Sequence, residues 1–440
     1  MSFTLLGILN SQASGGAAIV YRLQTLGGVG DDRGLSVTVD SSGNAYVFGR
    51  TDSTGAGDVD FFLAKYDSLA TIQWQRTLGG ASNDIGYSGI VDSSGNVYIA
   101  GYTASTGAGS DDFLLAKYDS SGTLQWQRVL GDSTRNQAYS LAVDSADNLY
   151  IAGYTQPSDF KFLLAKYNSS GTLQWQRTLG NADNQLGTSV TVDSANNVYI
   201  GGYATDGSAS FDFLLAKYNS SGTIQWQRTL GGTGRDDAYS LAVDSANNVY
   251  VFGYTGSTGA GSNDFLLAKY NSSGTIQWQR VLGGAANDIG RSVTVDSSGN
   301  VYVVGQTSSA GEGGDELLIA KYDSSGTIQW QRVLGAASGD IGYSITVDSS
   351  DNLYVCGSTN STGAGGNDFL LAVLPNDGSL TGTYVLDGVN MVYAVSTLTA
   401  ATSTLTAATS SLTSATSTLT AATSTLTSAS ASLTEHRVDL

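Results

Sequence analysis

Cysteine, histidine, proline and basic residues are all scarce in this chain of 440 residues. The single cysteine, Cys356, excludes an internal disulfide framework, and the single histidine, His436, excludes a histidine-based metal cluster. Lys and Arg number 20 against 38 Asp and Glu, so the net charge is −18. Twelve of the 20 cations recur at fixed positions of a repeat. No free basic stripe is left for the phosphates of a nucleic acid, and no nucleic-acid partner is expected.

Membrane-spanning and secretory segments are also missing. No stretch approaches the ~20 apolar residues that cross a bilayer. The first eighteen residues, MSFTLLGILNSQASGGAA, include a short apolar run, but no basic residue precedes Arg22. A secretory signal starts with positive charge. Residues 1–18 are therefore predicted to be a docking peptide rather than an export signal.

What the sequence does contain is a repeat, marked by its tryptophans. The stretch FLLAKYDSSGTLQWQRVLG (residues 113–131) recurs along the chain, and its Trp residues follow one another at intervals of 52, 49, 51, 52 and 52 residues. A fixed period near 50 residues is typical of solenoids and propellers. Glycine is abundant, at 56 residues, and proline numbers only 2, which fits strands joined by tight turns.

Each period predicts four short antiparallel strands. In one period they cover residues 139–144, 149–155, 162–167 and 173–179, with the Asx- and Ser-rich turns SADN and NSSG between paired strands. Four such strands make one propeller blade, and the first three are apolar enough to lie between neighbouring sheets. The VDSSGN-type turn occurs seven times, at Asp40, Asp92, Asp144, Asp193, Asp244, Asp296 and Asp348. We therefore predict an all-β, seven-bladed β-propeller of four-stranded blades over residues 19–388.

These repeats resemble the seven-bladed β-propeller repeat (SBBP-type) family of bacterial and phage proteins. The segment AKYDSSGTLQW (residues 116–126) is also similar to the tryptophan-docking motif of quinoprotein dehydrogenase propellers. That resemblance implies that the outer-strand tryptophans pack between blades. The six are Trp74, Trp126, Trp175, Trp226, Trp278 and Trp330. Quinone- and calcium-ligand constellations are missing, so no cofactor and no metal are expected.

Two incomplete copies of the fourth strand leave the closure of the ring open. One copy, residues 20–28, precedes the first turn, and the other, residues 380–388, follows the last FLLA segment. The pattern favours closure of the last blade by the N-terminal copy, with closure by the C-terminal copy as the alternative.

Loop lengths distinguish the two faces of the predicted propeller. The tight turns share one face and are uniform, whereas the loops on the other face are long and variable, as in residues 105–112 and 308–316. Binding residues concentrate on loops held by a rigid scaffold, so any recognition site is predicted on the variable face. A ring of polar residues there suggests either ligand binding or turn capping: Asp32, Asp84, Asn136, Gln185, Asp236, Asp288 and Asp340, with Asp112 and Glu316 as further candidates.

Residues 389–440 have a different pattern, a heptad of leucine and alanine among Ser and Thr. Leucines stand seven residues apart at Leu398, Leu405, Leu412, Leu419, Leu426 and Leu433, with alanines three residues further on at Ala401, Ala408, Ala415, Ala422 and Ala429. This spacing predicts an α-helical coiled-coil stalk that joins copies of the chain, as a homotrimer, through residues 391–440. A disordered linker and a glycosylated stalk are the alternatives.

The functional expectation follows from these parts. No nucleophile elbow, P-loop or His/Cys/acid cluster is visible, so an enzyme is not expected. Residues 1–18 resemble the opening segments of virion structural proteins from marine tailed phages. Together with the propeller and stalk, this suggests a phage virion appendage, such as a tail fibre, spike or head-surface decoration. Its expected partners are a host-surface glycan or protein, and other virion proteins through the N-terminus or stalk. The alternative is a bacterial surface or secreted adhesion protein.

Overall fold

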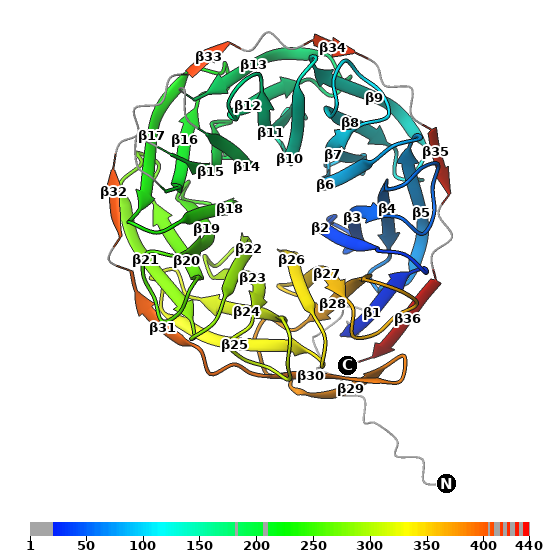
Figure 1. The fold of residues 1–440 in the computed structure, drawn as a ribbon, viewed down its shortest axis with the longest axis vertical. Coiled ribbons are helices and arrows are strands. Elements are labelled where there is room, and N and C mark those ends of the chain that lie inside the picture. Colours follow the sequence, from blue (N-terminus) through cyan, green and yellow to red (C-terminus); the bar gives the residue numbers. More distant parts are fainter. Residues whose placement is uncertain are drawn as a thin grey trace.

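The chain forms a ring of seven antiparallel sheets around a central channel, as a computed structural model shows (Figure 1). The structure describes residues 21–180, 184–205, 210–403, 405–408, 414–416, 420–422, 427–430 and 434–439. In each of the first six blades, the four strands follow the chain from the channel outward. This arrangement confirms the seven-bladed propeller that the seven repeated turns predict.

The blades have nearly identical strand lengths. Blades one to three consist of β2 (Arg33–Val39), β3 (Ala45–Thr51), β4 (Asp60–Tyr66) and β5 (Ile72–Gly79); β6 (Asp84–Val91), β7 (Val97–Thr103), β8 (Asp112–Tyr118) and β9 (Leu124–Gly131); and β10 (Arg135–Val143), β11 (Leu149–Gln156), β12 (Lys161–Tyr167) and β13 (Leu173–Leu179). Blades four to six consist of β14 (Gln185–Val192), β15 (Val198–Ala204), β16 (Asp212–Tyr218) and β17 (Ile224–Gly231); β18 (Asp236–Val243), β19 (Val249–Thr255), β20 (Asp264–Tyr270) and β21 (Ile276–Gly283); and β22 (Asp288–Val295), β23 (Val301–Thr307), β24 (Glu316–Tyr322) and β25 (Ile328–Gly335).

The seventh blade joins both ends of the ring. It contains β26 (Asp340–Val347), β27 (Leu353–Thr359), β28 (Asp368–Leu374) and β1 (Arg22–Gly27). β1 pairs antiparallel with β28, with Leu23 opposite Ala372. The N-terminal copy of the fourth strand therefore closes the ring. The C-terminal copy instead forms a hairpin of β29 (Gly382–Leu386) and β30 (Val389–Val395), which adds to the outside of blade six.

The repeated Asp of each first turn holds the blade together from within. Asp92 Oδ1 accepts hydrogen bonds from the backbone N–H groups of Ser94 and Asn96, and Asp92 Oδ2 accepts one from the buried hydroxyl of Tyr98 at 3.1 Å. The equivalent Asp and Tyr residues pair in all seven blades. A turn residue thus satisfies the one polar atom of a tyrosine that is otherwise packed in the core.

The tryptophans lie where one blade meets the next. Trp226 donates from Nε1 to the carbonyl of Ser272 at 3.2 Å, and its indole covers Gly274, where a Cβ atom would lie only 2.8 Å from the ring. Arg228 donates to the carbonyl of Gly274 at 2.8 Å. The Trp226 side chain is half-buried. The same contact with a turn glycine of the next blade is made by Trp74, Trp126, Trp175, Trp278 and Trp330.

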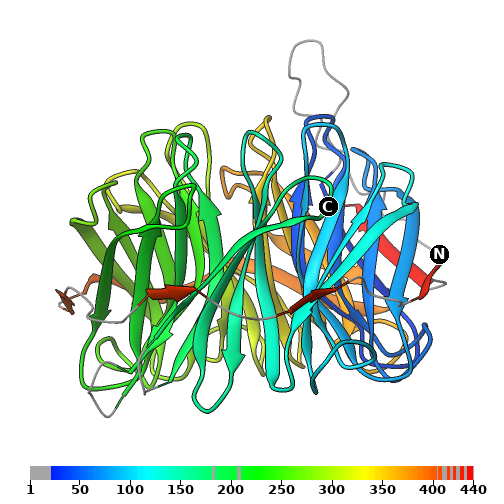
Figure 2. The ribbon, with the colours of Figure 1, turned by 90° about the horizontal axis from the view of Figure 1, so that it is seen from above.

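The C-terminal segment winds backwards around the outside of the ring. Its further strands are β31 (Thr399–Thr402), β32 (Thr406–Ala408), β33 (Ser414–Thr416), β34 (Thr420–Ala422), β35 (Thr427–Ser430) and β36 (Thr434–Asp439). From β30 to β36 they pair in turn with the outermost strands β25, β21, β17, β13, β9, β5 and β1. We call β30–β36 the tail belt. Figures 1 and 2 show it passing around the rim between the two faces.

The predicted coiled-coil stalk is not confirmed, because the described residues of this segment are strands and no helix occurs in the described part of the chain. Seven residues carry the belt from one blade to the next. The heptad leucine then falls between blades: Leu398 is buried in the core shared by blades five and six, and Leu405 packs against the core shared by blades four and five. Ser and Thr are weak helix formers, and β-branched Thr suits an extended chain.

The other leucines and alanines of the predicted coiled-coil seam lie in the short outer strands or outside the described residues. Ala401 lies opposite Val281 in the pairing of β31 with β21. Ala408, Ala415, Ala422 and Ala429 lie in β32 to β35, while Leu412, Leu419, Leu426 and Leu433 lie outside the described residues, as does the predicted docking peptide of residues 1–18. The homotrimer through residues 391–440 stays a prediction. Among the described residues, no helix is long and apolar enough to span a membrane.

Candidate binding site at the channel mouth

The channel is lined by residues that stand out of the strand pairing. In β6 the pairing with β7 passes from Gly86 to Ser88, so Tyr87 has no partner on the second strand. A bulge of this kind re-aims a side chain. The same break occurs in every innermost strand, and the skipped residues are Leu35, Tyr87, Tyr139, Thr188, Tyr239, Arg291 and Tyr343.

A serine after each bulge ties neighbouring blades together. Ser189 Oγ, for example, accepts a hydrogen bond of 3.0 Å from the backbone N–H of Leu241 in the next blade. The seven serines are Ser36, Ser88, Ser140, Ser189, Ser240, Ser292 and Ser344, and their bonds of 3.0–3.3 Å run all the way round the channel. Each bond satisfies a backbone group that faces another blade instead of a strand. The bulge side chains thus project from a backbone that these inter-blade hydrogen bonds hold in place.

The bulge side chains and their neighbours surround a cavity of about 280 Å³, which we call the channel site. It is lined by Leu35, Tyr87, Tyr139, Leu186, Thr188, Tyr203, Tyr239, Arg291 and Tyr343. The rings of Tyr87 and Tyr139 lie 4.6 Å apart, and those of Tyr203 and Tyr239 lie 6.4 Å apart. Burial raises the pKa of these four tyrosines, so their hydroxyls stay protonated and can donate hydrogen bonds.

Arg291 is the cation of the channel site. Its guanidinium carbon lies 5.1 Å from the ring centre of Tyr239 and 5.8 Å from that of Tyr343. One terminal nitrogen donates to Gln306 Oε1 at 3.2 Å, while Nε is buried and has no hydrogen-bond acceptor. Within the described part of the chain, no carboxylate forms an ion pair with it. The guanidinium is therefore held by cation–π contacts and keeps donor capacity for a ligand.

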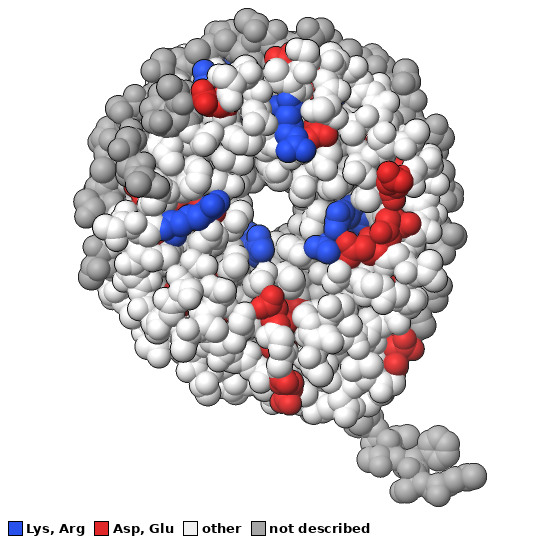
Figure 3. Space-filling view, in the orientation of Figure 1, with Lys and Arg blue, Asp and Glu red and all other residues white. Residues whose placement is uncertain are grey.

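Four other arginines stand around the same end of the channel, and each contacts a carboxylate. Arg33 and Arg50 share Asp31, at 3.0 and 2.6 Å. Arg135 pairs with Asp111 at 2.6 Å, and Arg235 pairs with Asp237 at 2.8 Å. Figure 3 shows cationic groups gathered around the opening, with acidic groups beside most of them.

Local electrostatics differ between these ion pairs. Burial alone would raise the pKa of Asp31, but hydrogen bonds from Arg33 and Asn367 and the charges of the two arginines hold this pKa below its ordinary value. Burial raises the pKa of Asp237, although hydrogen bonds from Tyr254 and Arg235 and the charge of Arg235 act to lower it. Both aspartates accept hydrogen bonds from their arginines.

The polar ring predicted from the sequence lies beneath the surface. Asp84 is buried, and its Oδ2 accepts hydrogen bonds from the Gly80 N–H and the Ser105 hydroxyl. The same arrangement holds the loops at Asp32, Asp236, Asp288 and Asp340. Asn136 and Gln185 are buried as well. The aspartates cap the turns, which is the second of the two roles that the sequence allowed, and a role in ligand binding stays a prediction.

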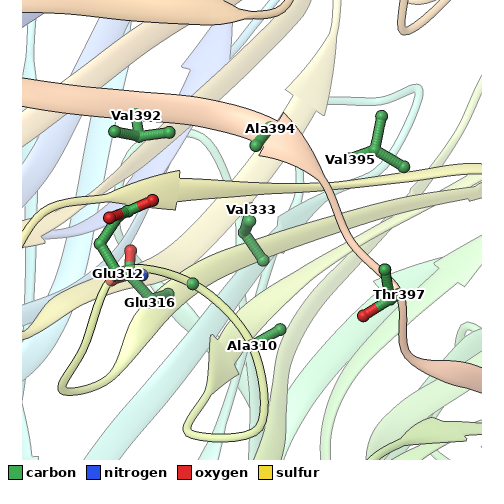
Figure 4. A pocket seen from close by; sticks show the side chains of 9 residues that line it. Ala310, Glu312, Glu316, Val333, Val392, Ala394, Val395 and Thr397 are labelled. Carbon is green, nitrogen blue, oxygen red and sulfur yellow. Dashed lines mark hydrogen bonds between the residues drawn. The ribbon is translucent and has the colours of Figure 1, made fainter.

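The two further candidates also support loops. Asp112 is buried and accepts from the N–H groups of Ala108 and Gly109. Glu316 is 1% exposed and accepts from the N–H of Glu312. It faces a second cavity of about 230 Å³ between the loop before β24 and the tail belt, where Val392, Ala394 and Val395 of β30 cross over it (Figure 4).

Glu316 lies close to a second carboxyl group. A Cβ atom on Gly335 would lie 1.6 Å from Glu316 Oε2 and 2.9 Å from Asp340 Oδ2, so both oxygens crowd the same point. Burial, followed by the charge of Asp340, raises the pKa of Glu316 to about 8. At neutral pH this carboxyl is thus mostly protonated. Within the described residues, no group of three or more His, Cys, Asp or Glu is arranged to hold a metal ion.

Sequence reasoning missed the channel site, although the repeats carried a signal for it. The residue four positions after each capping residue, such as Ser88 after Asp84, is Ser in all seven copies, while the residue before it is Leu, Tyr, Thr or Arg. An invariant position beside a variable one on the innermost strand indicates a frame that displays different side chains. Five of the eight cations outside the repeat positions also fall at the channel mouth, namely Arg33, Arg50, Arg135, Arg235 and Arg291.

Comparison with known families agrees with the fold. The β-propeller repeat model SBBP matches residues 20–55, 73–107, 125–161, 225–259, 277–311 and 329–363. A model for a β-propeller domain of unknown function, DUF5122, matches residues 93–124. Both models describe β-propeller repeats, which agrees with the seven blades of the structure.

Two curated proteins are similar over part of their length. The regulatory protein FlaEY of Caulobacter vibrioides is 32% identical over 123 residues, which cover 24% of this chain and 13% of that protein. The uncharacterized WD repeat-containing protein L264 of Acanthamoeba polyphaga mimivirus is 25% identical over 289 residues, 62% of this chain and 17% of that protein. This chain thus spans less than a fifth of either relative.

Similarity to solved structures is distant. Sqt1 from Chaetomium thermophilum is 11% identical with a TM-score of 0.44, and the match covers 84% of this chain and all of that one. A gluconolactonase from Xanthomonas campestris is 12% identical with a TM-score of 0.34, over 63% of this chain and 90% of that one. Likenesses this distant carry no argument about activity.

Proposed function

We propose that this chain is a non-enzymatic binding protein that presents its propeller to a ligand on a host surface or on another virion protein. The observation that carries the proposal is the channel site, where a rigid serine-bonded frame displays tyrosines and one arginine that has no carboxylate partner among the described residues. Aromatic rings with a few convergent polar groups in a concave site are typical of ligand binding. The variable loops surround this mouth, whereas the uniform turns occupy the far face.

The setting that we propose is a phage virion, with the protein as a tail fibre, spike or head-surface decoration. Support comes from the resemblance of residues 1–18 to the opening segments of marine tailed-phage virion proteins. The alternative is a bacterial surface or secreted adhesion protein. One curated relative is viral and the other bacterial, so the relatives leave both settings open.

Mass spectrometry of purified virions tests the setting. The proposal expects the protein in stoichiometric amounts in the particle. Its absence from virions, with its presence at a bacterial surface, would establish the alternative.

Loop replacement tests the binding face. Replacing residues 106–110 and 310–314 with glycine–serine segments of equal length, which spares the capping residues Ser105 and Ser309, should lower adsorption of the purified protein to host cells. The matched control carries Ser41→Ala and Ser93→Ala, which change exposed turn residues on the opposite face. Equal adsorption by the loop variant and this control would contradict a role of these two loops in binding.

A further inference from the structure

The chemistry of the channel site defines a class of ligand. We propose that it binds a carboxylated saccharide, such as the acidic sugar at the end of a glycan chain, with the carboxylate on Arg291. This inference rests on the proposed function for the place where the ligand is displayed, and goes beyond it by naming the ligand class and the residue that selects it.

Arg291 supplies the recognition of the charge. Its guanidinium is positioned between the rings of Tyr239 and Tyr343 and anchored by one hydrogen bond to Gln306. A planar guanidinium fork matches a carboxylate with two parallel hydrogen bonds. Because the side chain is already held in place, little conformational freedom is lost when such a ligand binds.

The tyrosines supply the recognition of the sugar ring. The paired rings of Tyr87 and Tyr139 offer apolar faces for the C–H groups of a pyranose, and the hydroxyls around the cavity match a polyol. Thr188 adds another hydroxyl to the lining. A cavity of about 280 Å³ accommodates a single sugar unit at the end of a glycan, while the rest of the glycan extends out through the open mouth of the channel.

The charge balance selects a singly charged ligand. Of the five arginines at this end of the channel, four contact carboxylates, and only Arg291 has none among the described residues. The whole chain carries −18, so a polyphosphate or another highly charged anion would be repelled. A neutral polyol offers hydroxyl oxygens as hydrogen-bond acceptors, but it would leave the positive charge of Arg291 without a negative partner among the described residues. One carboxylate per sugar fits both conditions.

Direct binding to the full-length protein tests the proposal, with glucuronate and its neutral counterpart glucose as probes. Saturation-transfer NMR and calorimetry should show glucuronate binding more tightly than glucose by about 10- to 100-fold, the range for a hydrogen-bonded charged group. Arg291→Gln should abolish this preference, and Arg291→Lys should restore part of it. Lys161→Gln removes one positive charge from the same face outside the cavity and should leave the preference unchanged.

The same measurements separate a wrong ligand class from a wrong function. Equal binding of glucuronate and glucose, or an unchanged preference in Arg291→Gln protein with a wild-type melting temperature, would overturn the inference. Adsorption to cells that glucuronate cannot compete away would also overturn it while leaving the proposed function standing. Direct glucuronate binding without any adsorption to cells would retain the site and contradict the proposed function.

Discussion

At the scale of single residues, buried acids divide into two groups with opposite effects on stability. The turn aspartates, such as the buried Asp144 and the half-buried Asp244, receive hydrogen bonds from asparagine and backbone N–H groups, and their pKa lies below the ordinary value. Their contribution to the free energy of unfolding is present above the unfolded-state pKa and is lost as the pH falls through the folded-state pKa. Glu316 behaves in the reverse way, because burial favours its protonated form.

Glu316 should make the protein less stable as the pH rises. Its pKa is about 8 in the folded state against an ordinary 4.5, so between these values the folded chain holds a proton that the unfolded chain has released. The free energy of unfolding should therefore fall from pH 4.5 to pH 8 and then level off. Urea denaturation at several pH values should show a shallower decline for Glu316→Gln, which keeps the acceptor for the Glu312 N–H. Parallel profiles for the two proteins would contradict this assignment.

At the scale of strands, the predicted blades are confirmed and the predicted coiled coil of the tail is not confirmed, for physical reasons. Each blade contains its own hydrogen bond between a turn aspartate and a tyrosine, such as Asp92 with Tyr98, so a local sequence pattern determines a local structure. Among the described residues of the tail, no Asp–Tyr pair of this kind occurs. A leucine every seven residues suits a coiled-coil seam, and it equally suits a chain that moves one blade further with every heptad. The choice between a coiled coil and a belt depends on the unpaired outer strands of the folded ring. The spacing of leucines in the sequence carries no information about those strands.

The belt leucines should contribute to stability where they enter the ring. Leu405 packs against the core shared by blades four and five, and Gln279 donates to its carbonyl at 2.8 Å. Leu405→Asp should therefore lower the free energy of unfolding by about 1–3 kcal/mol, the scale for one large apolar side chain. Thr402→Asp is the matched control, because Thr402 is exposed in the neighbouring strand. Equal losses in the two variants, measured by denaturant titration, would show that Leu405 does not pack there.

At the scale of the whole molecule, the number of repeats predicted the number of blades, but it did not predict the channel site. Seven turns and seven third strands were enough to count blades. The channel site depends on bulges that bring one residue from each of seven distant segments together. Its residues, from Leu35 to Tyr343, share no motif, and only closure of the ring makes them neighbours.

Removal of the belt distinguishes it from a stalk. A chain ending at residue 396 keeps β1 in the seventh blade and so should remain a closed propeller of the same oligomeric state as the full-length protein. It should be less stable, because six outer strands lose their partners. Sedimentation and thermal melting measure the two effects. If the full-length protein were a trimer and the shortened chain a monomer, the belt would not describe the protein in solution.

The position of β1 between β28 and β36 has a mechanical consequence. Arg22 lies opposite Asp439 and Gly27 lies opposite Thr434, so both described ends of the chain leave this strand pair at the same side. A load pulling residues 22 and 439 apart acts on one hydrogen bond after another instead of shearing all of them together. The pair would peel open at low force and expose the closing strand of the ring. Tension between the propeller and one end of the chain loads different bonds from tension between the two ends, so the point of attachment decides whether the ring survives it.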